Sequence, residues 1–178
     1  DLHKSPKEAY LTEISIVRGE IRSHLRHLGR WMRPAPRPTP LKLLPAKSRI
    51  VSQPLGQALI VAPWNYPVQL LLNPLVGAIS AGCTALLKPS PYTPNVAEAL
   101  EGMIAEIFDE EYVAVAQGGR EVNTLLFGMR WDVIFFTGSP ALGRIVMTAA
   151  ARNLTPVVLE LGGKSPSIVD RGADIEVA

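Results

Sequence analysis

Five short apolar segments, each followed by a turn and then by a helical pattern, constrain the fold of this chain most strongly. The first segment is apolar without alternation, which is typical of a strand that is buried on both faces. Strands that are separated by helices predict a parallel sheet with right-handed crossovers. We therefore predict an α/β fold with helices on both faces of the sheet and with strands at 55–62, 84–87, 112–116, 133–136 and 157–161.

Helices are expected between these strands, at 67–81, 93–108, 120–127 and 140–152. Pro67 and Pro140 fall in a first helical turn, where the missing N–H group is not needed. Gly82 follows the first of these helices and is a typical C-terminal stop. A further short strand is expected at 167–169.

A long helix is expected before the sheet. Residues 5–32 carry apolar side chains at intervals of three and four residues, and Ser5 followed by Pro6 is typical of a helix start. Residues 34–45 contain five prolines and are expected to form an extended connector. The sequence thus predicts two parts, residues 1–47 and residues 48–178.

The composition bears on several function classes. A net charge of +2 is too small to favour nucleic acid as a partner, and the arginines at 18, 22, 26 and 30 are read as one solvated helix face rather than an RNA-binding arm.

The single cysteine permits no internal disulfide, so we expect a reducing compartment, the cytoplasm. The histidines and the cysteine have no metal-ligand spacing, and no apolar run reaches the roughly 18 residues of a membrane span.

The candidate site residues follow the predicted strands. Ligands of open parallel sheets bind outside the carboxyl ends of the strands, so the loops that leave those ends should form the site. Those loops are residues 62–67, 88–91, 117–119 and 137–143, and the fifth strand carries Glu160 and the pair Gly162 and Gly163.

Three of these residues have two readings each. The amide of Asn65 could donate to a developing oxyanion, or it could cap the next helix. The ammonium of Lys88 must emerge into a cleft or onto the surface, where it could bind a ribose or phosphate or merely snorkel. Ser139 could open a phosphate-binding helix start, or serve only as its cap.

Glu160 lies at the end of an apolar run and is followed by Gly162 and Gly163, where backbone can approach a ligand closely. A carboxylate in such a setting can have a raised pKa and act as a general base. It could also be a simple carboxylate at the rim of the sheet. Cys83 is read as a small, inert core residue.

Taken together and in this order, the motifs resemble those of the aldehyde dehydrogenase superfamily. The resemblance rests on residues 63–67 (PWNYP), 87–90 (LKPS), 135–139 (FFTGS) and 159–166 (LELGGKSP), and it covers nearly the whole chain. Residues 27–32, 38–40 and 52–56 are most similar to the class 3 branch. That branch is associated with medium-chain, long-chain or aromatic aldehydes.

The resemblance implies a Rossmann-like sheet and a mechanism: thiolate attack on an aldehyde, hydride transfer to NAD or NADP, and hydrolysis of a thioester. Asn65 would be the oxyanion donor and Glu160 the general base. Residues 48–178 would be an incomplete NAD(P)-binding domain. The implied cofactor contacts are Pro63, Trp64, Lys88, Ser90, Gly118, Thr137, Gly138, Ser139, Leu161 and Gly162.

The chain departs from the family pattern at Pro91, where the family usually has a glutamate that binds the ribose hydroxyls. A carboxylate there would repel a 2′-phosphate, so its absence favours tolerance of NADP. The family's nucleophilic cysteine lies beyond the glutamate motif, in a separate catalytic domain. We therefore expect this chain to be a fragment without dehydrogenase turnover, and the complete protein to be a homodimer.

Two other functions stay open on the sequence. One is a catalytically inactive nucleotide-binding module. The other is a related acyl-phosphate or acyl-thioester reductase, although Glu160 as a deacylating base favours hydrolysis to the acid.

Overall fold

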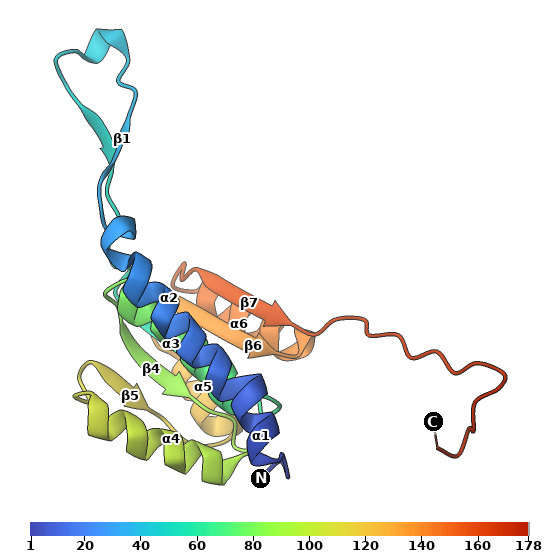
Figure 1. The fold of residues 1–178 in the computed structure, drawn as a ribbon. Coiled ribbons are helices and arrows are strands. Elements are labelled where there is room, and N and C mark those ends of the chain that lie inside the picture. The colour runs from blue at the N-terminus through green and yellow to red at the C-terminus, as the bar shows by residue number, and fades with distance from the viewer. Residues whose placement is uncertain (178) are drawn as a thin grey trace.

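The computed structural model describes residues 1–177 and is built around a five-stranded parallel sheet (Figure 1). The strand order is β5-β4-β3-β6-β7. The strands are β3 (Gln57–Val61), β4 (Thr84–Lys88), β5 (Val113–Val115), β6 (Val133–Gly138) and β7 (Val157–Leu161). The predicted α/β class and all five predicted strands are confirmed.

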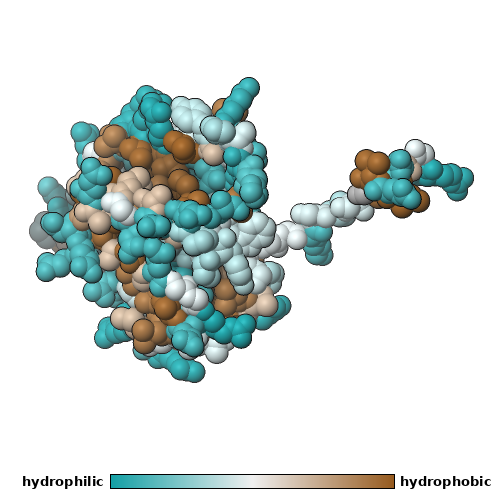
Figure 2. All heavy atoms as spheres, turned by 90° about the horizontal axis from the view of Figure 1, so that it is seen from below, coloured by the Kyte–Doolittle hydropathy of each residue, from teal (hydrophilic) through white to brown (hydrophobic). Residues whose placement is uncertain are grey.

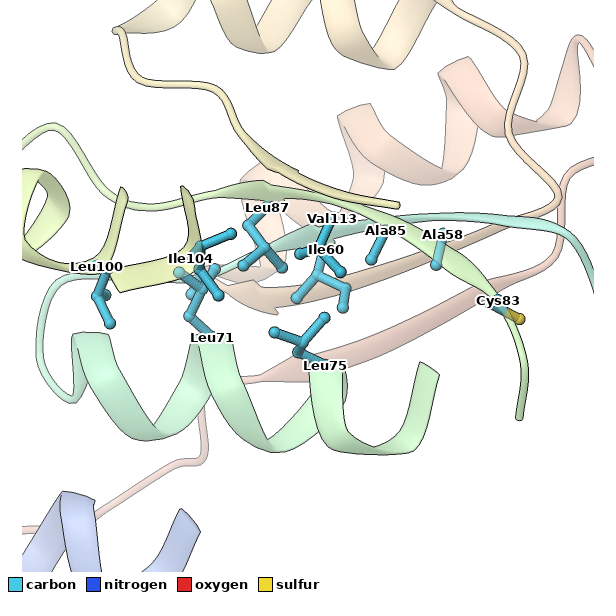
Figure 3. Packing of buried hydrophobic residues seen from close by; sticks show 11 residues of the cluster. Ala58, Ile60, Leu71, Leu75, Cys83, Ala85, Leu87, Leu100, Ile104 and Val113 are labelled. Atoms are coloured by element: carbon cyan, nitrogen blue, oxygen red, sulfur yellow. The ribbon is translucent and has the colours of Figure 1, made fainter. Parts of the chain in front are cut away.

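Helices cover both faces of the sheet (Figure 1). On one face, Leu71 of α3 and Leu100 of α4 belong to the same buried cluster as Ile60 of the central strand, and Figure 3 shows this cluster from close by. On the other face, α5 and α6 pack against Leu59, the next residue of that strand. The helices are α3 (Pro67–Ser80), α4 (Pro94–Ile107), α5 (Arg120–Gly128) and α6 (Pro140–Ala151). Burial of both faces of β3 explains its unbroken apolar sequence.

The long N-terminal helix is present and carries a π-helical turn that its periodicity did not reveal. It consists of α1 (Pro6–Ala9), the π turn η1 (Tyr10–Ile14) and α2 (Ser15–Trp31). The Oγ atom of Ser5 accepts a hydrogen bond from the backbone N–H of Glu8 at 3.1 Å, which confirms the predicted helix start. The helix packs along α3.

The proline-rich segment is not the plain connector that was expected. Strand β1 (Ala35–Arg37) pairs antiparallel with β2 (Ser48–Ile50), and the 3₁₀ turn η2 (Leu41–Leu43) lies between them. The hairpin stands away from the sheet (Figure 1). Both strands of a two-stranded ribbon are edges, where proline is tolerated, so proline content alone did not exclude pairing.

The division into two parts stays a prediction. The expected boundary between residues 47 and 48 falls inside the hairpin, because β1 and β2 pair across it. Ala178, the last residue of the second part, lies outside the described residues.

The strand expected at 167–169 does not form. Residues 162–170 adopt no helix or strand and run away from the sheet after β7. Ile168 is 89% exposed, and Figure 2 shows apolar atoms in the outer part of the tail that projects from the sheet domain. An apolar β-branched pair is therefore not sufficient for a strand where no described neighbour offers a pairing edge. Within residues 1–177, no helix combines the length and the apolar character that a membrane span requires.

Candidate active site

An open hollow of about 920 Å³ lies at the carboxyl ends of β3, β6 and β7. The crossover from β3 leads towards β4 and the crossover from β6 leads towards β7, so the loops after these two adjacent strands diverge. This divergence is the topological switch point at which ligands of open α/β sheets bind. Nine predicted site residues line the hollow: Pro63, Trp64, Asn65, Thr137, Gly138, Ser139, Glu160, Leu161 and Gly162.

Asn65 lines the hollow and does not cap α3. The N-cap residue of α3 is Tyr66, whose side chain makes no capping hydrogen bond. The amides of the first turn donate instead to the carboxylate of Glu13, from Val68 at 2.8 Å and from Gln69 at 3.3 Å. Of the two readings of Asn65, the capping one is not observed in this structure.

Ser139 does cap its helix. Its Oγ atom accepts a hydrogen bond from the backbone N–H of Leu142 at 3.3 Å, and Pro140 occupies the first helical position. The start of α6 nevertheless lines the hollow. A helix start carries partial positive charge, so this end of α6 can attract an anion even though the hydroxyl is engaged.

Thr137 and Gly138 are the last two residues of β6 and line the hollow. The Oγ1 atom of Thr137 is buried and has no hydrogen-bond partner among residues 1–177. A buried hydroxyl without a partner costs about 1–3 kcal/mol, so this oxygen has hydrogen-bonding capacity that the described residues leave unused. A Cβ on Gly138 would lie 2.6 Å from Cζ of Phe136, so the position has no room for a side chain.

Glu160 is the register partner of Thr137 across the β6–β7 pair, and its side chain is exposed. The backbone that follows is open, because no atom lies within 4 Å of a Cβ built on Gly162. A carboxylate at this place can therefore reach a molecule in the hollow.

The remaining three predicted residues do not line the hollow. Lys88 is 1% exposed, and its Nζ atom donates to the carbonyl oxygen of Pro89 at 2.7 Å. The expectation that its ammonium emerges from the protein is wrong, because the side chain finds an acceptor in the next residue. Burial lowers the pKa of Lys88 below its ordinary value of 10.5.

Ser90 and Gly118 shape turns after β4 and β5. The hydroxyl of Ser90 is buried and accepts a hydrogen bond from the backbone N–H of Tyr92 at 3.3 Å. Gly118 has a φ of +132°, and a Cβ there would collide with Cγ2 of Val122. The geometry of these turns is therefore sufficient to explain why a serine and a glycine occupy the two positions.

Five further residues line the hollow and were not predicted as site residues: Leu70, Asn73, Pro74, Phe135 and Pro140. The Oδ1 atom of Asn73 is buried without a partner among the described residues. An asparagine inside an otherwise apolar helix was the available signal, since buried polar groups are usually hydrogen-bonded.

The aldehyde dehydrogenase family model matches residues 12–178. The chain is 49% identical over 178 residues to the 4,4′-diaponeurosporen-aldehyde dehydrogenase of Staphylococcus aureus, and the match covers 100% of the chain and 39% of that protein. It is 47% identical over 174 residues to aldehyde dehydrogenase family 3 member B1 of Homo sapiens, covering 98% of the chain and 37% of that protein. The chain therefore spans less than two fifths of the length of these relatives.

Solved structures agree with these matches. The substrate-bound state of Staphylococcus aureus AldH superposes with a TM-score of 0.87 at 49% identity, over 95% of the chain and 37% of that structure. The Mycobacterium tuberculosis aldehyde dehydrogenase complexed with NAD+ superposes with a TM-score of 0.74 at 34% identity, over 84% of the chain and 31% of that structure.

Proposed function

The chain belongs to the aldehyde dehydrogenase family, and on this premise we propose that it supplies the cofactor site, the oxyanion donor and the general base of an enzyme that oxidises an aldehyde to a carboxylic acid. One observation carries the proposal. The amide of Asn65, the carboxylate of Glu160 and the start of α6 line one hollow at the switch point of the sheet.

The residues around the hollow fit a nicotinamide dinucleotide. The open backbone at Gly162 permits close approach of a ligand. The start of α6 at Ser139, together with Trp64, would hold the pyrophosphate, and Leu161 would face the nicotinamide. When bound, the cofactor accepts a hydride.

Two side chains would carry the chemistry that this chain contributes. The amide of Asn65 would donate a hydrogen bond to the aldehyde oxygen as negative charge develops there, and in other enzymes the loss of one such donor lowers kcat about 10²–10³-fold. The carboxylate of Glu160 would accept a proton from the attacking thiol or from the water that hydrolyses the thioester.

The nucleophile would have to come from outside these 178 residues. Cys83 is the only cysteine of the chain, and it is buried directly before β4. It therefore lies at the amino end of a parallel sheet whose carboxyl end forms the hollow. We propose that the 178-residue chain by itself does not turn over an aldehyde.

The proposed substrate is an apolar aldehyde. Leu70, Pro74 and Phe135 contribute apolar surface to the hollow. Several relatives belong to family 3, and one is named for a 4,4′-diaponeurosporen-aldehyde. A cytoplasmic homodimer is proposed for the complete protein, and NADP is proposed beside NAD because Pro91 replaces the usual glutamate.

Hydrogen–deuterium exchange of the chain with NAD+ and with NADP+ tests the cofactor site. Binding should slow amide exchange in residues 137–143 and 160–163. Residues 35–50 of the hairpin serve as an internal control, since they lie away from the hollow and should be unaffected. Unchanged exchange at residues 137–143 with both cofactors would refute the proposed site.

A further inference from the structure

Glu13 is a buried carboxylate that serves a helix other than its own. It is 4% exposed, and its Oε2 atom accepts from the amides of Val68 and Gln69 at 2.8 and 3.3 Å. These amides belong to the first turn of α3, where unpaired N–H groups and the helix dipole favour a negative charge. Glu13 therefore caps α3 from 55 residues away.

This arrangement changes what Asn65 is free to do. The caps of α1 and α6 accept from the amide three residues on: Ser5 from Glu8, and Ser139 from Leu142. By the same spacing, Asn65 would cap through Val68, and that amide is occupied by Glu13. The amide that Tyr66 would use, on Gln69, is occupied as well.

Lys4 connects this carboxylate to the backbone of Asn65. Its Nζ atom lies 2.8 Å from Oε1 of Glu13 and donates to the carbonyl oxygen of Asn65 at 2.6 Å. The same atom lies 4.1 Å from the ring centroid of Tyr66. The ammonium therefore neutralises the buried carboxylate and restrains the peptide that carries the Asn65 side chain.

The helix geometry at Glu13 is also unusual. Glu13 lies in the π-helical turn Tyr10–Ile14, between two α-helical segments. Single π turns inside α-helices are rare and are frequently found at functional sites.

We infer that Glu13 and Lys4 are positioning residues for Asn65. They occupy the start of α3 and hold the Asn65 backbone, so the Asn65 amide is left for the hollow. The inference rests on the proposed role of Asn65 as the oxyanion donor. If Glu13 only attached the N-terminal helix to the sheet, its substitution would have the same effect on kcat with and without the Asn65 side chain. If it positions Asn65, its effect on kcat depends on that side chain.

A double-mutant cycle separates these roles in the protein expressed at its full encoded length. Glu13→Gln should lower kcat for an aldehyde roughly tenfold, because small displacements of a catalytic group have large effects on rate. The KM for the cofactor should not change. In the Asn65→Ala background, Glu13→Gln should lower kcat no further.

Three further variants guard against a general loss of folding. Lys4→Arg should retain kcat and Lys4→Met should reduce it, although both keep the Glu13 cap. Glu8→Gln alters an exposed carboxylate of the same helix and should have no effect. Equal effects of Glu13→Gln in both backgrounds would overturn the inference in favour of the structural role.

The side-chain amide signals of Asn65 give a test that needs no turnover. In protein with isotope-labelled asparagine, Glu13→Leu, which leaves the Val68 amide without its acceptor, should shift these signals as the Oδ1 atom of Asn65 accepts from that amide. Unchanged signals would overturn the inference. A wild-type protein that binds cofactor but oxidises no aldehyde would instead refute the proposed function, and the signals would still decide the role of Glu13.

Discussion

Thr137 and Glu160 lie opposite each other on the paired strands β6 and β7. One contributes a buried hydroxyl without a partner among the described residues, and the other an exposed carboxylate. Both residues line the hollow, so a proposed cofactor contact and the proposed general base lie next to each other on neighbouring strands. The parallel register of these two strands is sufficient to bring them together.

Asn65→Ala should reduce activity without reducing stability. We expect kcat to fall about 10²–10³-fold, the typical effect of removing one oxyanion donor. The free energy of unfolding should change by less than about 0.5 kcal/mol, because Glu13 caps α3 and Asn65 does not. Urea unfolding checks this, and a loss of about 1 kcal/mol would indicate that Asn65 is a cap after all.

Gly118→Ala should destabilise the fold by about 2 kcal/mol. The substitution places a side chain at a φ of +132° and against Val122. Gly102→Ala is the matched control, since Gly102 lies within α4 with no atom within 4 Å of its built Cβ. That control should stabilise the protein by up to about 1 kcal/mol, so thermal unfolding should shift in opposite directions for the two variants.

Lys88 should make stability rise with pH in the alkaline range. Because burial lowers its folded pKa below the ordinary value of 10.5, the unfolded chain binds the proton more tightly than the folded chain. Burying the charged ammonium lowers the free energy of unfolding. This loss of stability is complete below the lowered pKa and disappears as the pH rises from there towards 10.5.

Lys88→Met tests this effect. The stability of the variant relative to the wild type should be greatest at neutral pH, where the wild type carries the buried charge, and should fall as the pH rises towards the upper end of that range. Urea unfolding at a series of pH values measures the difference. A gain that does not depend on pH would show that it arises from packing and not from the buried charge.

Pro91→Glu should discriminate against NADP+. Pro91 is exposed in the turn after β4, and a carboxylate there would repel a 2′-phosphate by about 1 kcal/mol, or roughly fivefold in Kd. Calorimetric titration with both cofactors measures this ratio. Pro91→Gln controls for the loss of proline, and an equal shift in both variants would remove the electrostatic explanation.

Much of the fold could be predicted because apolar runs and helical periodicity act locally. The five strands and four crossover helices followed from that pattern, and so did the loops of the hollow, since the carboxyl ends of parallel strands meet at one edge. The choice of individual residues within those loops rested on the resemblance to the family. The hairpin could not be predicted in this way. Pairing of β1 with β2 depends on contacts across the intervening residues, about which proline content says nothing.

The parts of the structure that were missed leave no trace in the pattern of apolar residues. An apolar run that ends at Lys88 does not indicate that its ammonium will turn back to Pro89. The cap that Glu13 supplies to α3 has no local signature, because donor and acceptor are 55 residues apart. The π turn at Tyr10–Ile14 leaves the apolar spacing of the helix nearly unchanged.

The most direct test of the central claim is an aldehyde oxidation assay on the protein at its full encoded length, with wild type and Glu160→Gln compared. The wild type should produce one reduced nicotinamide cofactor and one carboxylic acid for each aldehyde it consumes. Glu160→Gln should lose most of its steady-state turnover while its cofactor affinity is kept. Equal turnover in the two proteins, or no aldehyde-dependent cofactor reduction by the wild type, would contradict the proposed function.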